Sequence, residues 1–422
     1  MKIKLTKPGE DCREMGRADY RAGLPREAVR EFFGEKSLAF QKWLEGWDEE
    51  HHKLRSYMQF TVSKSALLKE LTLLQGVVMK KSTIPVLANV LLTVAGDSLT
   101  IKATDLDISF TTACEIEDVK GHGSVCLSSK KLFDIVRSLP EAEIKFECDE
   151  ESRVTIRCER SRFKLHGLAS ENFPEVQTVE DGFIPFPAEM LRSFIGHTAF
   201  AITTDDSRYT MNCAKFEVNG KCRMVTTDGH RLSLIEADAI GDLKMDVLIP
   251  KKTLAEVARL CAETDEAIEV AHTDKQVHFR LGKRLLSSRL LEGEFPNYEL
   301  ILPKGNDIKL LIPLARISAA VRRIALMSDE RSHTIRLDVA PGKLTVVAPP
   351  SEFGDADEII PIEFEGAPLS FAVNAEYFMD FFAVAHEGDV LIELKDGQSQ
   401  ILMRNSNGEA FDFRYVVMPM RL

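Results

Sequence analysis

The sequence predicts an α+β fold in which one unit occurs three times, each copy with two helices packed on an antiparallel sheet. Three stretches share one order of strand, helix, turn and alternating strands, and they begin at Leu127, Leu248 and Phe371, at offsets of 121 and 123 residues. A second set of helical segments precedes them at about the same interval, and its members begin at Phe60, Ile184 and Leu310. The chain shows no βαβ alternation and no glycine-rich phosphate loop, which disfavours a nucleotide-binding enzyme.

The apolar positions of the first copy fall at the spacing of two amphipathic helices. Those of the first helix are Leu67, Leu71, Leu74 and Val78. Those of the second are Leu132, Ile135, Val136 and Leu139. Ser63 stands directly before the first helix, where its hydroxyl could accept a backbone N–H bond as an N-cap. Between the helices, LTIKATDLDISFTTACEI alternates apolar and polar residues, which predicts two half-buried antiparallel strands with a turn at Ala103 to Asp107.

The repeat divides the chain into an N-terminal extension, residues 1–57, and three domains, residues 58–182, 183–306 and 307–422. The extension contains both tryptophans and is predicted to form two short helices, the second able to begin at Pro25. Its segments GRADYRAG and WLEGWDEEHH have a short resemblance to small ribosome-modulation-factor-like proteins. Three alternatives stay open: an appended ribosome- or protein-interaction module, a flexible tail, or an upstream region that the cell does not translate, with Met58 as the true start.

The composition excludes several classes of protein. A chain of 422 residues, 44% of them hydrophobic, can bury a full core in two to four domains. No apolar run reaches the roughly 18 residues of a membrane helix, and the first 20 residues lack the apolar centre of a secretory signal, so we expect a cytoplasmic protein without membrane contact. The eight cysteines form no CxxC pair and have no nearby histidine cluster. We therefore expect reduced, mostly buried thiols and neither metal nor cofactor.

The helices carry bases although the net charge is −12, a value that weighs against a surface that binds nucleic acid throughout. These bases are Lys64, Lys69, Lys80, Lys81, Lys130, Lys131, Arg137, Arg192, His197, Lys251, Lys252, Arg259, Arg316, Arg322 and Arg323. Lys and Arg are good helix formers, so each helix alone could simply be solvated. However, Lys130 and Lys131 recur as Lys251 and Lys252 at the 121-residue offset. This recurrence favours a shared basic face that neutralises phosphates without reading bases.

Two predicted edge strands carry opposite charge. In the first domain, RCERSRFKLHGL places bases at Arg157, Arg160, Arg162 and Lys164. In the third, SEFGDADEIIPIEFE places acids at Asp355, Asp357 and Glu358. The tail of one chain could therefore meet the head of another, and such a heterologous contact forms a ring if the rotation closes and a filament if it does not. Alternatively, the charges only prevent aggregation of exposed edges.

Five motifs then follow one another along the chain: IPVLANVLLTV, RYTMN, VTTDGHRLSL, EGEFPNYELILP and the terminal YVVMPMRL. With the threefold repeat, they make residues 58–422 similar to the bacterial DNA polymerase III beta subunit, the replication sliding clamp. The resemblance implies three DNA-clamp domains per chain and a head-to-tail homodimeric ring, with helices around a hole that double-stranded DNA threads. It implies a processivity factor of the polymerase III holoenzyme that has no catalytic residues and is placed on DNA by a clamp loader.

The resemblance also implies a hydrophobic pocket between the second and third domains. There the DNA polymerase III catalytic subunit, other polymerases, the clamp loader and repair proteins would insert short linear motifs. Methionines can repack around different guests, and glycine permits close approach of a backbone. The residues matched to this pocket are Arg208, Met211, Thr227, Gly229, His230, Arg231, Leu232, Pro296, Asn374, Tyr377, Val416, Val417, Met418, Pro419, Met420, Arg421 and Leu422.

The resemblance, together with the charges above, implies two further surfaces. The predicted DNA contacts are Lys80, Lys81, Lys130, Lys131, Arg137, Arg192, Tyr209, Lys251, Lys252, Arg259, Arg322 and Arg323. The predicted dimer contacts are Arg160, Arg162, Phe163, Leu165, Leu326, Met327, Asp355, Asp357 and Glu358. Ser332 stands where the family usually has a bulky apolar residue, and Leu300 where a base is common. We therefore expect an altered pocket rim and a shifted peptide preference.

Two other classes of function were weighed against a DNA tether. A DNA- or RNA-processing enzyme would need Mg²⁺ ligands or an acid–base pair, and the candidates are Asp105 with Asp107 in DLDISF, and Asp228 with His230 in TDGHR. Tight turns between strands explain both pairs without chemistry. A repeat protein that only scaffolds partners is the other alternative.

Overall fold

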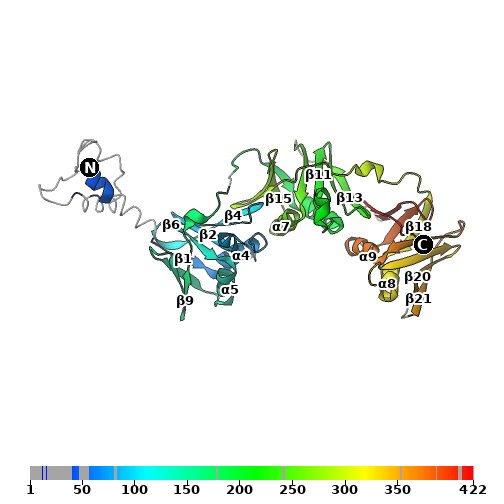
Figure 1. The fold of residues 1–422 in the computed structure, drawn as a ribbon, viewed down its shortest axis with the longest axis horizontal. Coiled ribbons are helices and arrows are strands. Elements are labelled where there is room, and N and C mark those ends of the chain that lie inside the picture. The colour runs from blue at the N-terminus through cyan, green and yellow to red at the C-terminus, as the bar shows by residue number, and fades with distance from the viewer. Residues whose placement is uncertain are drawn as a thin grey trace. The chain divides into compact units, whose positions relative to one another are not determined.

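The computed structural model describes residues 12, 16, 40–46, 57–79, 83–176, 179–239, 243–351, 354–385, 387–406 and 411–421. The chain forms two compact units (Figure 1): Met1–Thr178 with Gly282–Leu286, and Val179–Leu281 with Ser287–Leu422. In the extension, residues 40–46 are helical, and Phe40 stacks on the buried Trp43. Apart from residues 40–46, the structure describes only Cys12, Gly16 and Tyr57 of the extension. No helix of the described residues is long and apolar enough to cross a membrane.

The first unit contains two antiparallel sheets and a pair of adjacent helices. One sheet consists, in order, of β5 (Glu117–Gly121), β1 (Met58–Ser63), β7 (Glu143–Cys148), β8 (Arg153–Cys158) and β9 (Ser161–His166). The other consists of β4 (Ile108–Glu115), β3 (Ser98–Thr104), β2 (Asn89–Ala95) and β6 (Gly123–Ser128), with the start of β17 (Arg284–Arg289) beside β4. The helices α4 (Lys64–Leu74) and α5 (Ser129–Ser138) pack against each other.

The core of this unit follows the predicted stripes except at Val78 and at Ile135, which is only half-buried on α5. Leu67, Leu71 and Leu74 are fully buried on α4. The helix ends before Val78, which is only half-buried, and Val77 enters the core instead. The N-cap prediction for Ser63 is wrong: the residue occupies that position, but its hydroxyl lies 2.9 Å from the hydroxyl of Ser65 and makes no capping bond.

A buried ion pair joins α4, β4 and β17 inside the first unit. Arg284 donates two hydrogen bonds to the Glu70 carboxylate, at 2.6 and 2.9 Å, and Thr112 donates a third at 2.5 Å. Both charged side chains are almost removed from solvent. Loss of one partner from such a pair typically costs about 3–5 kcal/mol, because the remaining charge stays buried. The pair therefore requires residues 282–286 to stay with the first unit.

The second unit is built on an eight-stranded sheet. Its order is β14 (Met245–Pro250), β11 (Cys213–Asn219), β12 (Lys221–Thr227), β13 (Arg231–Asp238), β25 (Asp412–Val417), β24 (Ile401–Asn405), β23 (Asp389–Leu394) and β18 (Ile308–Pro313). A four-stranded sheet consists of β21 (Gly354–Pro361), β20 (Lys343–Ser351), β19 (Thr334–Ala340) and β22 (Leu369–Asn374). Three strands stand side by side as β10 (Ile184–Pro187), β15 (Ala267–His272) and β16 (Gln276–Leu281).

Two more helix pairs complete the repeat pattern. One is α6 (Ala188–Thr198) beside α7 (Lys251–Cys261). The other pair is α8 (Leu314–Ile324) beside α9 (Ala375–Val384) (Figure 1). The α+β prediction of three copies, each with a helix pair and antiparallel strands, is confirmed. The placement of His197 on an exposed basic face is wrong, because its ring is buried edge-on against Phe413 and lies 2.8 Å from the Ser193 carbonyl.

His278, on β16, predicts a pH dependence of stability. Its ring is fully buried, which lowers its pKa below the usual 6.5, and its Nδ1 lies 2.8 Å from the Ser287 hydroxyl. The unfolded chain therefore binds this proton more readily than the folded one. The contribution to stability is complete above about pH 6.5 and is lost as the pH falls, by at most about 1.4 kcal/mol per pH unit.

Urea unfolding of the full chain at pH 8 and pH 5.5 measures this loss. His278→Gln, which keeps a hydrogen-bonding group but does not titrate, should lose less stability over that interval than the parent protein. An equal loss in both proteins would show that His278 is not responsible.

Candidate functional site

The C-terminal tail is both a core strand and a partly exposed surface. In β25, Val416 and Val417 are buried and lie opposite Leu232 and Arg231 of β13. Beyond the strand, the backbone N–H of Met418 donates to the His230 carbonyl at 2.9 Å, and that of Met420 donates to the carbonyl of Ala372, on β22, at 2.7 Å. The Met418 side chain stays 41% exposed, and Pro419 and Met420 are half-buried.

An apolar cluster lies beneath this tail. Its buried members come from four strands and the short helix η6 (Tyr298–Leu300), and they are Val225, Leu232, Leu234, Tyr298, Leu402 and Val416. Phe295, Ile301 and Leu302 are partly buried and pack against the cluster. Two predicted pocket residues, Leu232 and Val416, are thus members of this cluster. A third, Pro296, follows Phe295 in the sequence. Leu300 is 79% exposed, so it presents an apolar side chain to solvent beside this cluster.

Arg231 connects the walls of the site. Its Nε donates to Asp228 at 3.0 Å, Nη1 to Asp380 at 2.5 Å and to the Tyr415 hydroxyl at 3.2 Å, and Nη2 to the Phe200 carbonyl at 3.0 Å. The guanidinium lies 4.4 Å from the centre of the Tyr377 ring. Burial alone would lower the Arg231 pKa, but Tyr415 and Asp380 raise it above its ordinary value. This guanidinium, 10% exposed, is bonded to its own chain and fixes the walls of the site.

The turn between β12 and β13 explains the Asp-Gly-His sequence structurally. Asp228 accepts backbone N–H bonds from His230 and Arg231 at 2.9 and 3.0 Å. Thr227 donates its hydroxyl to the Arg231 carbonyl at 2.6 Å and accepts the N–H of Gly229 at 3.1 Å. Gly229 has φ +88°, a conformation that disfavours residues with a Cβ. This geometry is that of a structural turn. The Asp228 carboxylate accepts hydrogen bonds from two backbone N–H groups and from the Arg231 guanidinium.

Two further predicted pocket residues contact the groups that hold the tail: Tyr377 through Arg231 and the Tyr415 hydroxyl, and Arg208 through the Asp228 carbonyl. Arg208 and Met211 come from the short helix η5 (Asp206–Met211), and Asn374 and Tyr377 from the start of α9. Asn374 caps α9 by accepting the Glu376 N–H at 2.8 Å. Leu422 lies outside the described residues. The sequence did not indicate Asp228, Asp380 or Tyr415 as partners of Arg231, and only contacts across the fold identify them.

The predicted DNA contacts are mostly exposed helix residues. Those with exposed side chains are Lys130, Lys131, Arg137, Arg192, Tyr209, Lys252, Arg259, Arg322 and Arg323. Lys251 differs from its repeat partner Lys130, because it is half-buried and its ammonium lies 3.4 Å from the Ile202 carbonyl. Arg323 binds Glu358 through two hydrogen bonds, so these two predicted contacts pair with each other. Lys80 and Lys81 lie outside the described residues.

The predicted dimer contacts lie on or beside edge strands. Arg162, Phe163 and Leu165 are on β9, which ends the five-stranded sheet, and Arg160 is in the turn before it. Asp355, Asp357 and Glu358 are on β21, which ends the four-stranded sheet. Leu326, in the short helix η7 (Ala325–Met327), is 82% exposed, and the Met327 methyl group approaches Gly354 of β21. The charge pattern of the sequence did not indicate Ile359, an exposed apolar residue two positions beyond Asp357 on β21.

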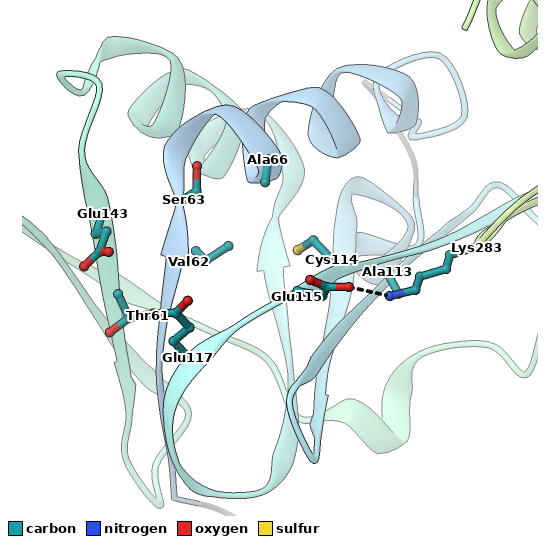
Figure 2. A pocket seen from close by; sticks show the side chains of 10 residues that line it. All are labelled: Thr61, Val62, Ser63, Ala66, Ala113, Cys114, Glu115, Glu117, Glu143 and Lys283. Atoms are coloured by element: carbon teal, nitrogen blue, oxygen red, sulfur yellow. Dashed lines mark hydrogen bonds and ion pairs between the residues drawn. The ribbon is translucent and has the colours of Figure 1, made fainter. Parts of the chain in front are cut away.

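An open cleft of about 430 Å³ in the first unit is lined by none of the predicted site residues (Figure 2). Lys283 pairs with Glu115 there at 3.4 Å, and burial with the nearby Glu70 raises the pKa of the Cys114 thiol to about 12. Such a thiol is a poor nucleophile at neutral pH.

The Asp105 carboxylate accepts the N–H groups of Asp107 and Ile108 in a turn. Within the described part of the chain no group of three or more His, Cys, Asp or Glu residues could hold a metal ion.

Comparison with known proteins agrees with this arrangement. Residues 58–177, 186–297 and 299–421 match the N-terminal, central and C-terminal domains of the DNA polymerase III beta subunit. Curated beta sliding clamps of Pseudomonas aeruginosa and Escherichia coli are 35% and 31% identical to the chain, and each alignment covers 86% of it and all of the relative.

Solved structures give the same result. A sliding clamp from Pseudomonas aeruginosa bound to griselimycin has a TM-score of 0.81 at 34% identity, with 86% of this chain and 100% of that chain covered. The beta sliding clamp of C. crescentus has a TM-score of 0.82 at 32% identity, with 87% and 100% covered. Together with the three helix pairs and the tail strand β25, which lies between β13 and β24 inside the eight-stranded sheet, these matches show that the chain belongs to the DNA polymerase III beta subunit family, the bacterial sliding clamps.

Proposed function

We propose that two copies of this chain close head to tail into a ring that encircles double-stranded DNA and tethers the replicative polymerase to it. In this role the protein is a non-catalytic processivity factor that works at the replisome, in the cytoplasm. The observation that carries the proposal is the recurrence of lysine pairs at the start of equivalent helices in a protein of net charge −12. For the N-terminal extension the same three alternatives remain: an interaction module, a flexible tail, or an upstream region that the cell does not translate.

The position of these lysines favours a phosphate-binding role over simple solvation. Lys130 and Lys131 lie in the first turn of α5, and Lys251 and Lys252 in the first turn of α7, and neither first turn contains an acid. The helix dipole disfavours cations at this end. The free N–H groups of a helix N-terminus, however, bind phosphate oxygens. Helix propensity therefore does not explain the lysines, whereas a sequence-independent DNA contact does.

Complementary edges support the head-to-tail dimer. The β9 edge offers Arg162 and the apolar Phe163 and Leu165, and the β21 edge offers carboxylates beside the exposed Leu326 and Ile359. Opposite charges guide the register of two surfaces, and the apolar residues supply the area that is removed from water. Because the two edges are different surfaces, the contact is heterologous and can close into a ring.

The tail supports a site for many partners. A polymerase, a clamp loader or a repair protein would place a short apolar motif against Met418 and Met420, whose flexible side chains repack around different guests. The partners would compete, because they would use one surface. The exposed Leu300 extends this surface with an apolar group, so we expect this clamp to favour guests with an apolar residue at that end.

Removing exposed lysines tests the DNA contact. The variant Lys130→Ala, Lys131→Ala, Lys252→Ala should bind duplex DNA more weakly, and its salt dependence should flatten by about 0.9 in log–log slope per lost phosphate contact. Lys251 is left in place because it bonds the Ile202 carbonyl. Lys120→Ala, Lys304→Ala, Lys309→Ala removes the same charge from exposed positions off the helices and serves as the control. Equal slopes in the two variants would contradict the assignment.

Mutation of the edges tests the dimer. Leu326→Asp with Ile359→Asp should convert a protein of two chains into one of a single chain, because two charged carboxylates would replace the apolar area that the contact removes from water. Light scattering gives the molar mass, and circular dichroism checks the fold. Leu311→Asp is the control, since Leu311 is also exposed but lies on β18, a strand of neither predicted edge. A double variant that stays dimeric would refute the interface.

Shortening the tail tests the partner site. Deletion of Met418 to Leu422 leaves β25 complete and removes the Met418 and Met420 hydrogen bonds, each worth about 1 kcal/mol. We expect a folded protein that no longer binds a clamp-binding peptide from a polymerase III catalytic subunit, measured by fluorescence anisotropy. Met418→Ala should weaken binding by at least about fivefold without altering the fold. Unchanged peptide affinity in Met418→Ala would place the guest elsewhere.

A further inference from the structure

The short helix η5 links the exposed Tyr209 to the tail through two glycines. Tyr209 is 58% exposed, and its hydroxyl lies 3.3 Å from the point that a Cβ on Gly293 would occupy. The Thr210 methyl group lies 3.0 Å from the same point. Gly293 has φ +128°, so both space and backbone conformation favour glycine there. The tyrosine is therefore seated on the segment that leads to Pro296 in the partner site.

Arg208, the residue before Tyr209, rests on the second glycine. Its Nη1 donates to the Asp228 carbonyl at 3.1 Å and lies 2.8 Å from the point that a Cβ on Gly229 would occupy. Its backbone, with φ −112° and ψ 50°, leaves the helical region inside a short 3₁₀ stretch. The start of that stretch is held by Asp205, which accepts the N–H and the hydroxyl of Ser207 at 3.0 and 2.7 Å.

The turn under Arg208 also holds the tail. The carbonyl that Arg208 binds belongs to Asp228, and two residues later the His230 carbonyl accepts the N–H of Met418. The path from Tyr209 to Met418 therefore runs through Arg208, the Asp228 carbonyl and the His230 carbonyl. Arg208 is 44% exposed, and its Nε lies 3.8 Å from the exposed Asp205 carboxylate. Its Nη1 could therefore exchange the neutral Asp228 carbonyl for a stronger acceptor such as a phosphate, in competition with Asp205.

We propose that Arg208 is a positioning residue that couples DNA contact at Tyr209 to guest binding at the tail. This inference rests on the proposed function, because it takes Tyr209 as a DNA contact and Met418 as part of the guest site. In the free ring, Arg208 holds the turn and keeps Met418 on the His230 carbonyl. When DNA reaches Tyr209, a phosphate draws Arg208 off the turn, Met418 repacks at lower cost, and guests bind more tightly. By linkage, a bound guest strengthens DNA binding by the same factor.

The test measures two affinities of the full-length ring. A labelled 30-base-pair duplex reports DNA binding, and a labelled peptide with the clamp-binding motif of a polymerase III catalytic subunit reports guest binding, each with and without a saturating amount of the other. In the parent protein we expect DNA to tighten peptide binding by about fivefold or more, the lower end of common coupling factors. Peptide should tighten DNA binding equally.

Three variants separate the possible roles. Arg208→Ala should bind peptide without DNA nearly as tightly as the DNA-bound parent protein does, and DNA should change that affinity no further. Tyr209→Ala should keep the weak, DNA-free affinity at every DNA concentration that still saturates the ring. Arg153→Ala removes an exposed arginine of β8 that belongs to none of the predicted surfaces, so it is the matched control and should keep the coupling.

The outcomes are distinguishable from failure of the proposed function. If neither probe binds the parent protein, the proposed function fails. If both bind but their affinities are independent, the coupling is refuted. If Arg208→Ala weakens peptide binding equally with and without DNA, Arg208 touches the guest directly and the positioning role is overturned.

Discussion

In the second unit, the packing of α9 against β25 and the β12–β13 turn depends on one buried cation, the guanidinium of Arg231. The Arg231 guanidinium sits between the β12–β13 turn, α9, β25 and the carbonyl of Phe200, and a buried charge is tolerated only when its donors are satisfied. This requirement fixes α9 against the strand that ends the chain. It also places the Tyr377 ring beside the guanidinium and the Tyr415 hydroxyl within reach of the Tyr377 carbonyl, at 3.0 Å. The walls of the proposed partner site are thus fixed by the buried charge of Arg231 and its hydrogen bonds, while the Met418 side chain stays exposed.

Local periodicity accounts for what the sequence predicts well. The leucines of α4, the alternating strands and the edge positions of β9 and β21 follow from patterns within ten or so residues. The failures depend on neighbours from elsewhere in the chain. His197 looks like a surface base until Phe413 covers it, and Ser63 looks like a cap until Ser65 meets its hydroxyl.

The partner site was predicted only through family resemblance, and physical terms explain why. Arg231 reaches Asp380 across 149 residues and Tyr415 across 184, and no periodic pattern encodes such pairs. The apolar tail left two alternatives, a buried strand or a groove wall. The described tail is partly each: Val416 and Val417 pack in the sheet, and Met418 reaches solvent.

The Glu70–Arg284 pair means that the repeat seen in the sequence and the unit that folds together have different boundaries. Arg284 falls within the stretch that matches the central domain, yet it neutralises a carboxylate of the first unit. A dissected protein cut where the sequence motif ends would leave Glu70 as a lone acid in an apolar interior. A first unit produced on its own would therefore need residues 282–286 of β17 supplied as part of the same chain or as a separate peptide.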